Sequence, residues 1–140
     1  MIEITGLHHV SLAVTDLERS RAFYRDVLGL REIERPAFVF AGAWFALGDR
    51  QLHLIVHTAA TLRTRGIDSH DVHVALRVKS YRGTVAALRA RGYDEHAVDE
   101  TKRLRENPAG KAGFPQVFIL DPDRHVIELN AERVDECVSS

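Results

Sequence analysis

The chain contains one pattern twice. The run Leu7–Val14, LHHVSLAV, returns in weaker form as Asp71–Val78, DVHVALRV. Each copy places a histidine at the head of a run in which apolar and polar residues alternate, which is typical of a half-buried β-strand. Each copy continues with an amphipathic segment that has a glycine near its end, and then with shorter strand-like runs. We therefore expect two copies of one folding unit, with matching polar residues that build one site from two halves.

The first unit is expected to span residues 5–57. Alternation predicts a strand over His9–Val14, after which Asp16 is placed to cap a helix at its N-terminus. The apolar stripe of that helix ends at Gly29, as a C-terminal glycine should end it. Three further strands are predicted over residues 30–34, 37–47 and 51–56, with a hairpin turn at residues 48–50.

The second unit is expected to span residues 71–131. A strand to Val78 is followed by a helix near residues 80–91, with Ser80 as its cap and Gly92 at its end. After this helix we expect a mobile polar loop at 101–113 and then strands at 114–120 and 125–130, joined by a turn at 121–124. Residues 58–70 are expected to link the two units, and residues 132–140 to form a solvated tail. The fold class is α+β, with one domain over residues 5–131.

The bulk composition excludes several classes of function. A chain of 140 residues fits one compact domain, and its net charge of −1 gives no reason to expect nucleic acid or an anionic membrane as a partner. No apolar stretch approaches the roughly 20 residues of a membrane span, and the first residues do not form a signal peptide. The single cysteine, Cys137, excludes an intrachain disulfide and fits a reducing cytoplasm. The expectation is a cytoplasmic protein.

Two adjacent histidines open the first strand. Successive strand residues face opposite sides, so His8 and His9 are not expected to point into one site. His9 shares a face with Ser11 and Ala13, the smaller and more polar side, whereas His8 is expected at a strand edge. His9 is therefore the candidate ligand.

Four possible metal ligands occupy matching places in the two units: His9 and His73 on the first strands, and His53 and Glu128 on the last. The first pair is separated by 64 residues and the second by 75, and we assign the 11 extra residues to the longer loop of the second unit. Glu128 lies in a run expected to be largely buried, where an unpaired carboxylate would cost several kcal/mol. It needs either a metal ion or a salt bridge, for which Arg77 on the His73 face is the alternative. Imidazole and carboxylate together suit Zn, Ni, Co, Mn or Fe(II), and two histidines with one carboxylate would also suit non-haem iron.

These residues resemble the vicinal oxygen chelate superfamily, which includes glyoxalase I, fosfomycin-resistance proteins, methylmalonyl-CoA epimerase, extradiol dioxygenases and bleomycin-resistance proteins. The most specific matches are HVSLAVTDL at 9–17, FYRDVLGL at 23–30, and FILDPD at 118–123 leading to Ile127 and Glu128. The resemblance implies two βαβββ modules in a curved mixed sheet, with one divalent metal held by His9, His53, His73 and Glu128. It also implies a homodimer whose sites are shared between subunits.

One position departs from glyoxalase I, which usually has glutamate where this chain has His53. Three neutral imidazoles, one carboxylate and a divalent cation leave a centre of charge +1, which favours an anionic oxygen as ligand. The change also removes a carboxylate that could shuttle protons. By analogy, Glu128 remains as the candidate catalytic base.

The resemblance implies a metal-dependent lyase or isomerase of glyoxalase type. Its small substrate would chelate the metal through adjacent oxygens and react through an enolate-like intermediate. Four loop cations could hold an anionic end such as glutathione, or could form a solvated loop: Lys102, Arg103, Arg105 and Lys111.

Two alternatives remain open. One is a fosfomycin-type thiol transferase or epoxide hydrolase, because the segment AGAWFALG at 41–48 resembles a strand of small residues and tryptophan in those proteins. Against it, those enzymes generally use three protein ligands. The other is a drug-binding resistance protein without catalysis, against which four retained donors argue.

Overall fold

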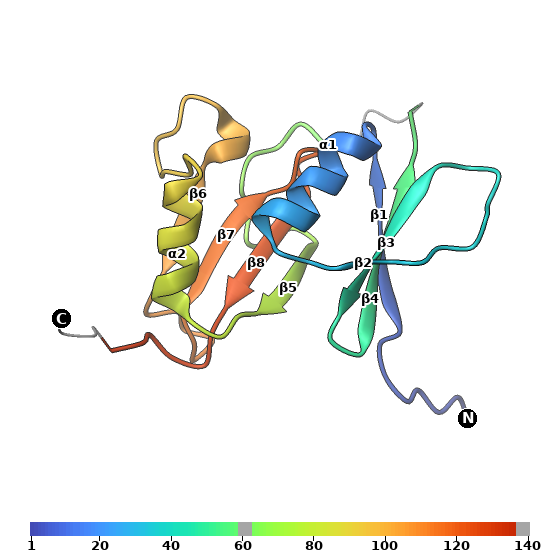
Figure 1. Ribbon diagram of the computed structural model, residues 1–140. Coiled ribbons are helices and arrows are strands. Elements are labelled where there is room, and N and C mark those ends of the chain that lie inside the picture. Colours follow the sequence, from blue (N-terminus) through green and yellow to red (C-terminus); the bar gives the residue numbers. More distant parts are fainter. Residues whose placement is uncertain (59–62, 137–140) are drawn as a thin grey trace. The chain divides into compact units, whose positions relative to one another are not determined.

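The computed structural model describes residues 1–58 and 63–136, and the chain divides into two compact units, residues 1–62 and 63–140 (Figure 1). Unit 1 contains β1 (His9–Val14), α1 (Leu17–Ala22), a π-helical turn (Phe23–Val27), β2 (Glu32–Ile33), β3 (Gly42–Leu47) and β4 (Arg50–Val56). Unit 2 contains β5 (His73–Arg77), α2 (Tyr81–Ala90), a 3₁₀ turn (Glu100–Lys102), β6 (Leu104–Asn107), β7 (Gln116–Leu120) and β8 (Val126–Asn130). The order strand, helix, three strands occurs twice, which confirms the predicted α+β fold of two βαβββ modules.

Each unit forms a four-stranded mixed sheet within the described residues, in the orders β1-β4-β3-β2 and β5-β8-β7-β6. The first and last strands of each unit run parallel, and the other neighbours are antiparallel. The register also repeats. His53 is paired with Ser11 and Trp44, and Glu128 is paired with the equivalent Ala75 and Phe118. His53 and Glu128 therefore occupy the same position in the two sheets.

One face of the unit 1 sheet packs against its helical segment. Val14, Phe45 and Leu54 are buried on this face, and the Tyr24 ring after α1 lies 6.1 Å from that of Phe45. Asp16 caps α1 by accepting a hydrogen bond from the Arg19 amide, as predicted. The helical segment widens into the π turn before Gly29, whose φ of 69° confirms the predicted stop.

Unit 2 buries the equivalent face against α2, which contributes Tyr81, Val85 and Leu88. The predicted cap and stop of this helix are both confirmed. Ser80 accepts from the Gly83 amide, and Gly92 has a φ of 86°. The turn between β7 and β8 also forms as predicted, because Asp121 Oδ1 accepts hydrogen bonds from the amides of residues 123 and 125.

The expected mobile loop at 101–113 is wrong in its first half, where β6 pairs with β7 and Leu104 is 2% exposed. Charged residues on both sides of Leu104 hide its alternation in the sequence. The register also shows where the 11 extra residues of unit 2 lie. His9 and its equivalent His73 are 64 residues apart, but Ile33 of β2 and its equivalent Arg105 of β6 are already 72 residues apart. Most of the insertion therefore precedes β6. A smaller correction concerns β3, which begins at Gly42 rather than at residue 37.

The C-terminal segment is attached to α2 rather than free. The Asp135 carboxylate accepts from the Tyr81 amide at 2.8 Å and from the Ser80 hydroxyl, and its carbonyl oxygen accepts from Arg82. The prediction of a solvated tail is therefore wrong for Asp135. Cys137 lies outside the described residues, as does part of the predicted linker. No helix within residues 1–58 and 63–136 is long and apolar enough to cross a bilayer.

Candidate metal centre

Unit 2 brings His73 and Glu128 together. His73 Nε2 lies 3.1 Å from Glu128 Oε2, and the carboxylate is almost fully buried. The other ring nitrogen, Nδ1, lies 2.8 Å from the Asp71 carbonyl oxygen. Because a carbonyl can only accept, Nδ1 carries the proton, and in the neutral ring the lone pair of Nε2 faces the carboxylate. Two electron-rich atoms at this distance need a proton or a metal cation between them.

The geometry of this pair fits a divalent metal. With metal–ligand distances of about 2.0–2.2 Å, two ligands at right-angled or tetrahedral positions lie about 2.9–3.4 Å apart. The separation of 3.1 Å falls in this range. The Asp71 carbonyl is the kind of outer partner that fixes the tautomer of a metal-binding histidine. His73 and Glu128 thus have the spacing that two neighbouring metal ligands would need.

The alternative partner for Glu128 is wrong. The Arg77 guanidinium lies over the Phe114 ring, 5.3 Å from its centroid, and among the described residues the side chain that faces Glu128 Oε2 is His73. The second carboxylate oxygen, Oε1, accepts hydrogen bonds from the side-chain amides of Gln116 and Asn130.

Unit 1 also brings its two predicted ligands together, but in a different arrangement. The rings of His9 and His53 stack with centroids 4.2 Å apart, and Trp44 stacks on the other face of His53 at 4.0 Å. His53 Nε2 is 2.8 Å from Gln51 Oε1. Burial lowers the pKa of His53, and the nearby His9, His8 and Arg35 lower it further. His53 therefore stays neutral, with Nε2 as the donor to Gln51.

Stacking limits what the unit 1 pair can bind as it stands. An imidazole lone pair lies in the plane of its ring, and the planes of two stacked rings do not converge on one nearby point. One ring must turn before a single ion can bind both. His9 is exposed, whereas His53 is only 8% exposed, so His9 is the ring that turns more easily. His8 was expected to point elsewhere, but its Nδ1 lies 2.8 Å from His9 Nδ1.

The four predicted ligands therefore lie as two pairs, one in each unit. Within residues 1–58 and 63–136, no group of three or more histidine, cysteine or acidic side chains stands ready to hold a metal ion.

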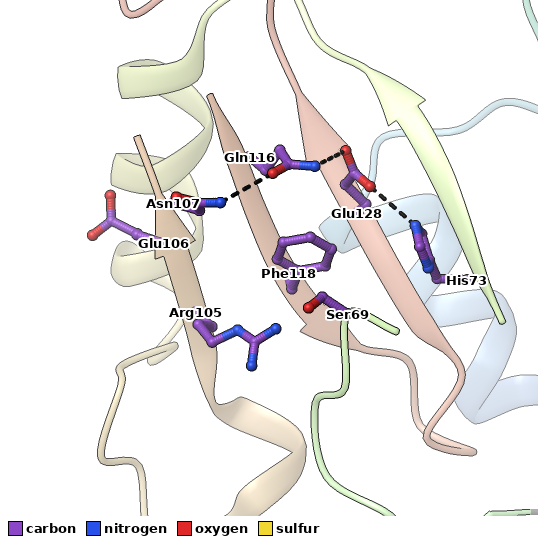
Figure 2. A pocket seen from close by; sticks show the side chains of 8 residues that line it. All are labelled: Ser69, His73, Arg105, Glu106, Asn107, Gln116, Phe118 and Glu128. Carbon is purple, nitrogen blue, oxygen red and sulfur yellow. Dashed lines mark hydrogen bonds and ion pairs between the residues drawn. The ribbon is translucent and has the colours of Figure 1, made fainter. Parts of the chain in front are cut away.

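A cavity of about 400 Å³ opens beside the His73–Glu128 pair (Figure 2). It is lined by Ser69, His73, Arg105, Glu106, Asn107, Gln116, Phe118 and Glu128. The Arg105 guanidinium lies 5.4 Å above the centre of the Phe118 ring, and no acidic side chain of the described residues is paired with it. A cation without an acidic partner beside a cavity can bind an anionic group.

The other three predicted loop cations do not line this cavity. Lys102 Nζ lies 4.6 Å over the ring of Tyr93. Arg103 donates to the Ala97 carbonyl oxygen at 2.9 Å, and Lys111 is an exposed residue of the turn after β6. Of the four predicted cations, Arg105 alone lines the cavity beside His73 and Glu128, while Arg103 shares a second cavity with it.

Sequence reasoning missed the polar residues that contact the candidate ligands. Gln51 and Asn130 each lie two positions from a candidate ligand on the same strand, and Gln116 lies on the neighbouring strand. The alternation that identified the ligands places these residues on the same face, so a search at two-residue spacing could have found two of the three.

Comparison with known proteins places the chain among related sequences. The model of the Glyoxalase/Bleomycin resistance protein/Dioxygenase superfamily matches residues 6–129. A lactoylglutathione lyase of Salmonella typhimurium is 30% identical over 140 residues, covering 88% of this chain and 90% of the relative. "Glyoxylase I 4" of Arabidopsis thaliana is 29% identical over 131 residues, covering 91% of this chain and 71% of the relative.

A solved structure supports the fold. A mutant of the fosfomycin resistance protein FosX from Listeria monocytogenes, complexed with Mn(II) and 1S,2S-dihydroxypropylphosphonic acid, has a TM-score of 0.69 and 20% identity. The alignment covers 92% of this chain and 93% of that one. At this identity the likeness concerns the fold alone.

Proposed function

Because the chain belongs to the Glyoxalase/Bleomycin resistance protein/Dioxygenase superfamily, we propose that it is a divalent-metal-dependent lyase or isomerase of glyoxalase type. Its substrate would be a small molecule with two adjacent oxygens. The observation that carries the proposal is the buried Glu128 carboxylate facing His73 Nε2 at 3.1 Å, beside an open cavity. The similarity to lactoylglutathione lyase over most of both chains supports this reaction class.

We propose that His9, His53, His73 and Glu128 supply the ligands for one ion of the Zn, Ni, Co, Mn or Fe(II) class. When bound, the ion supplies Lewis acidity toward the adjacent oxygens of the substrate. For His53 to take part, its Nε2 must leave Gln51, and the exposed His9 ring must turn from its stack with His53. His73 and Glu128 need no such rearrangement.

The side chains around the cavity would bind and orient the substrate. Arg105 is placed to hold an anionic group, such as a carboxylate of glutathione, while Phe118 supports the guanidinium. Glu128 is the proposed base: once loosened from the metal, its Oε2 would accept the proton of the carbon that bears the substrate hydroxyl and return it to the neighbouring carbonyl carbon, while the hydroxyl proton passes to the former carbonyl oxygen. The product is then an isomer, and no further reactant is needed.

We also propose a homodimer in which His9 and His53 of one subunit share a metal with His73 and Glu128 of the other. Mixing a His9→Ala variant with a Glu128→Ala variant tests this directly. A shared arrangement regenerates one intact site per mixed dimer, so activity returns on mixing. If each site is built within one chain, every site carries a substitution and activity stays absent.

The proposed function is tested by measuring metal content and isomerase activity together. Purified chain loaded separately with Zn, Ni, Co, Mn or Fe(II) is assayed with the methylglyoxal–glutathione hemithioacetal, and we expect metal-dependent loss of the hemithioacetal. The same preparations are assayed for thiol or water addition to fosfomycin. Activity only on the epoxide would replace the proposal with a fosfomycin-type enzyme. Tight drug binding with no turnover would indicate a resistance protein without catalysis.

A further inference from the structure

We propose that Gln116 and Asn130 are positioning residues that hold Glu128 so that only Oε2 is presented to His73 and the metal. This inference rests on the metal site of the proposed function. It concerns how the carboxylate is held, and it assigns a role to two residues outside the predicted ligand set.

Two amide groups occupy one oxygen of the carboxylate. Gln116 Nε2 and Asn130 Nδ2 each donate to Glu128 Oε1 at 2.9 Å. A carboxylate oxygen has two lone pairs, and two donors fill them. Oε1 is therefore unavailable as a second metal ligand or as a proton acceptor, whereas Oε2 remains directed at His73 Nε2.

A hydrogen-bond chain fixes the orientation of the first amide. Asn107 Nδ2 donates to Gln116 Oε1 at 3.1 Å, and Gln116 Nε2 in turn donates to Glu128 (Figure 2). The chain ends on a carboxylate, which can only accept when ionised, so the donors must all point toward Glu128. Residues from three neighbouring strands, β6, β7 and β8, thus form one directed network.

The second amide, that of Asn130, donates to Glu128, while its own carbonyl oxygen is left without a hydrogen bond in the part of the chain that the structure describes. Asn130 is 7% exposed, and its buried Oδ1 has no hydrogen-bond partner among the described residues. Turning the amide over would aim this carbonyl oxygen at Glu128 Oε1 and lose the bond to it. A buried acceptor without a partner is rare in folded proteins and calls for an explanation. The explanation here is that the amide is oriented to donate from Nδ2 to Glu128, which leaves its own Oδ1 without a donor within residues 1–58 and 63–136.

The equivalent positions in unit 1 carry no amide. In the repeated register, Gln116 corresponds to Gly42 and Asn130 to Ile55. A side chain is excluded at Gly42, because a Cβ there would lie 2.3 Å from the Leu54 carbonyl oxygen. The two amides therefore occur only in the unit that carries the carboxylate, as expected if their role is specific to Glu128.

Cobalt(II) binding tests the inference without recourse to activity. The dissociation constant for Co(II) and the visible spectrum of the bound ion are measured for wild type, Gln116→Met and Asn130→Leu, two apolar replacements of similar length that cannot donate to Glu128. Loss of an outer-shell partner typically weakens metal affinity about 10–100-fold, and we expect a loss of this size for each variant. We also expect an altered spectrum, because Oε1 becomes free to coordinate.

Asn107→Ala tests the outer end of this network, since Asn107 contacts Gln116 but not Glu128. Its effect on the Co(II) dissociation constant should be well below that of the other two variants. Thermal unfolding without metal shows whether each variant is folded. If Gln116→Met does not fold, Asn130→Leu still tests the inference, and this variant also removes a buried acceptor that is unpaired among the described residues. Folded variants with wild-type affinity and spectrum would overturn this inference alone. A wild-type chain that binds no Co(II) would overturn the metal proposal and this inference with it.

Discussion

At one equivalent position of their sheets, the two units hold a candidate ligand in opposite states, engaged in unit 1 and open in unit 2. His53 and Glu128 share one register position, each beside a first-strand histidine. In unit 1, Gln51 occupies the ring nitrogen Nε2, and two aromatic rings enclose His53. In unit 2, two amides occupy the oxygen that faces away from the partner histidine and leave the facing oxygen open. The backbone determines where a ligand side chain lies, and its polar neighbours decide whether it is ready to bind.

The largest expected effect separates the two units directly. Glu128→Gln keeps the shape of the side chain but removes the charge and the proton acceptor. We expect kcat/KM to fall about 10²–10⁴-fold, together with loss of stoichiometric metal, since a general base alone contributes this much. His53→Gln should cost less in both measurements, because His53 is engaged elsewhere before metal binds. Equal losses of metal in the two variants would contradict the distinction.

Arg105 provides the next difference between the units, because its register equivalent in unit 1 is the apolar Ile33. We expect Arg105→Met to raise KM for an anionic substrate about 10-fold or more with a smaller change in kcat, because a charge-assisted hydrogen bond is lost. Arg103→Met is the matched control, since its guanidinium is bonded to Ala97 and does not line the cavity. Steady-state kinetics of both variants decide the matter. An equal rise in KM would indicate general charge attraction.

Gln51 should have a smaller effect of the opposite sign. If Gln51 competes with the metal for His53 Nε2, then Gln51→Met should tighten Co(II) binding about 2–10-fold, the equivalent of one neutral hydrogen bond. Substitution of Gln116 or Asn130 should weaken it. Titration calorimetry with Co(II) shows for each variant whether the dissociation constant falls or rises. Weaker binding in Gln51→Met would show that Gln51 supports His53 as a ligand and would remove the contrast between the units.

Much of the fold was accessible from the sequence because its signals are local. The repeat and its alternation predicted the strands that carry the ligands, and capping chemistry predicted the helix limits at Asp16, Ser80, Gly29 and Gly92. β6 was missed because the charged residues on both sides of Leu104 hide its alternation, although its partner β7 is the next strand in the chain. The attachment of Asp135 to α2 was missed because it is a long-range interaction: 54 residues separate the carboxylate from the amide that donates to it.

The candidate site was accessible only in part. Alternation assigned the four donors to one face of their strands, but it could not indicate ring stacking or the choice of hydrogen-bond partner. Gln51 and Gln116 have the same side chain, yet one presents its oxygen to a ligand and the other its nitrogen. That choice depends on whether the ligand is an imidazole with an N–H to donate or a carboxylate that only accepts. It can be derived only after the pairs are known.

The last expected effect concerns stability at alkaline pH rather than metal binding or catalysis, and it arises in unit 2. The residue after the helix-ending glycine is Leu30 in unit 1 but the buried Tyr93 in unit 2. Burial, and then the nearby Asp99, raises the pKa of Tyr93 from 10.0 to about 12. Between these two values the unfolded chain releases the phenolic proton while the folded chain keeps it, so the free energy of unfolding falls as pH rises.

Tyr93→Phe tests this through the urea midpoint measured from pH 9 to pH 12. The variant should lose less stability than wild type across this interval, and the two should show the same pH dependence below pH 10, where Tyr93 is protonated in both states. Tyr81→Phe is the comparison in the same unit, because burial and Glu106 raise the pKa of Tyr81 even further. Parallel curves for wild type and Tyr93→Phe would mean that the folded chain opens around Tyr93 before the phenol ionises. The segment after α2 would then unfold locally at a pH at which the two sheets still hold.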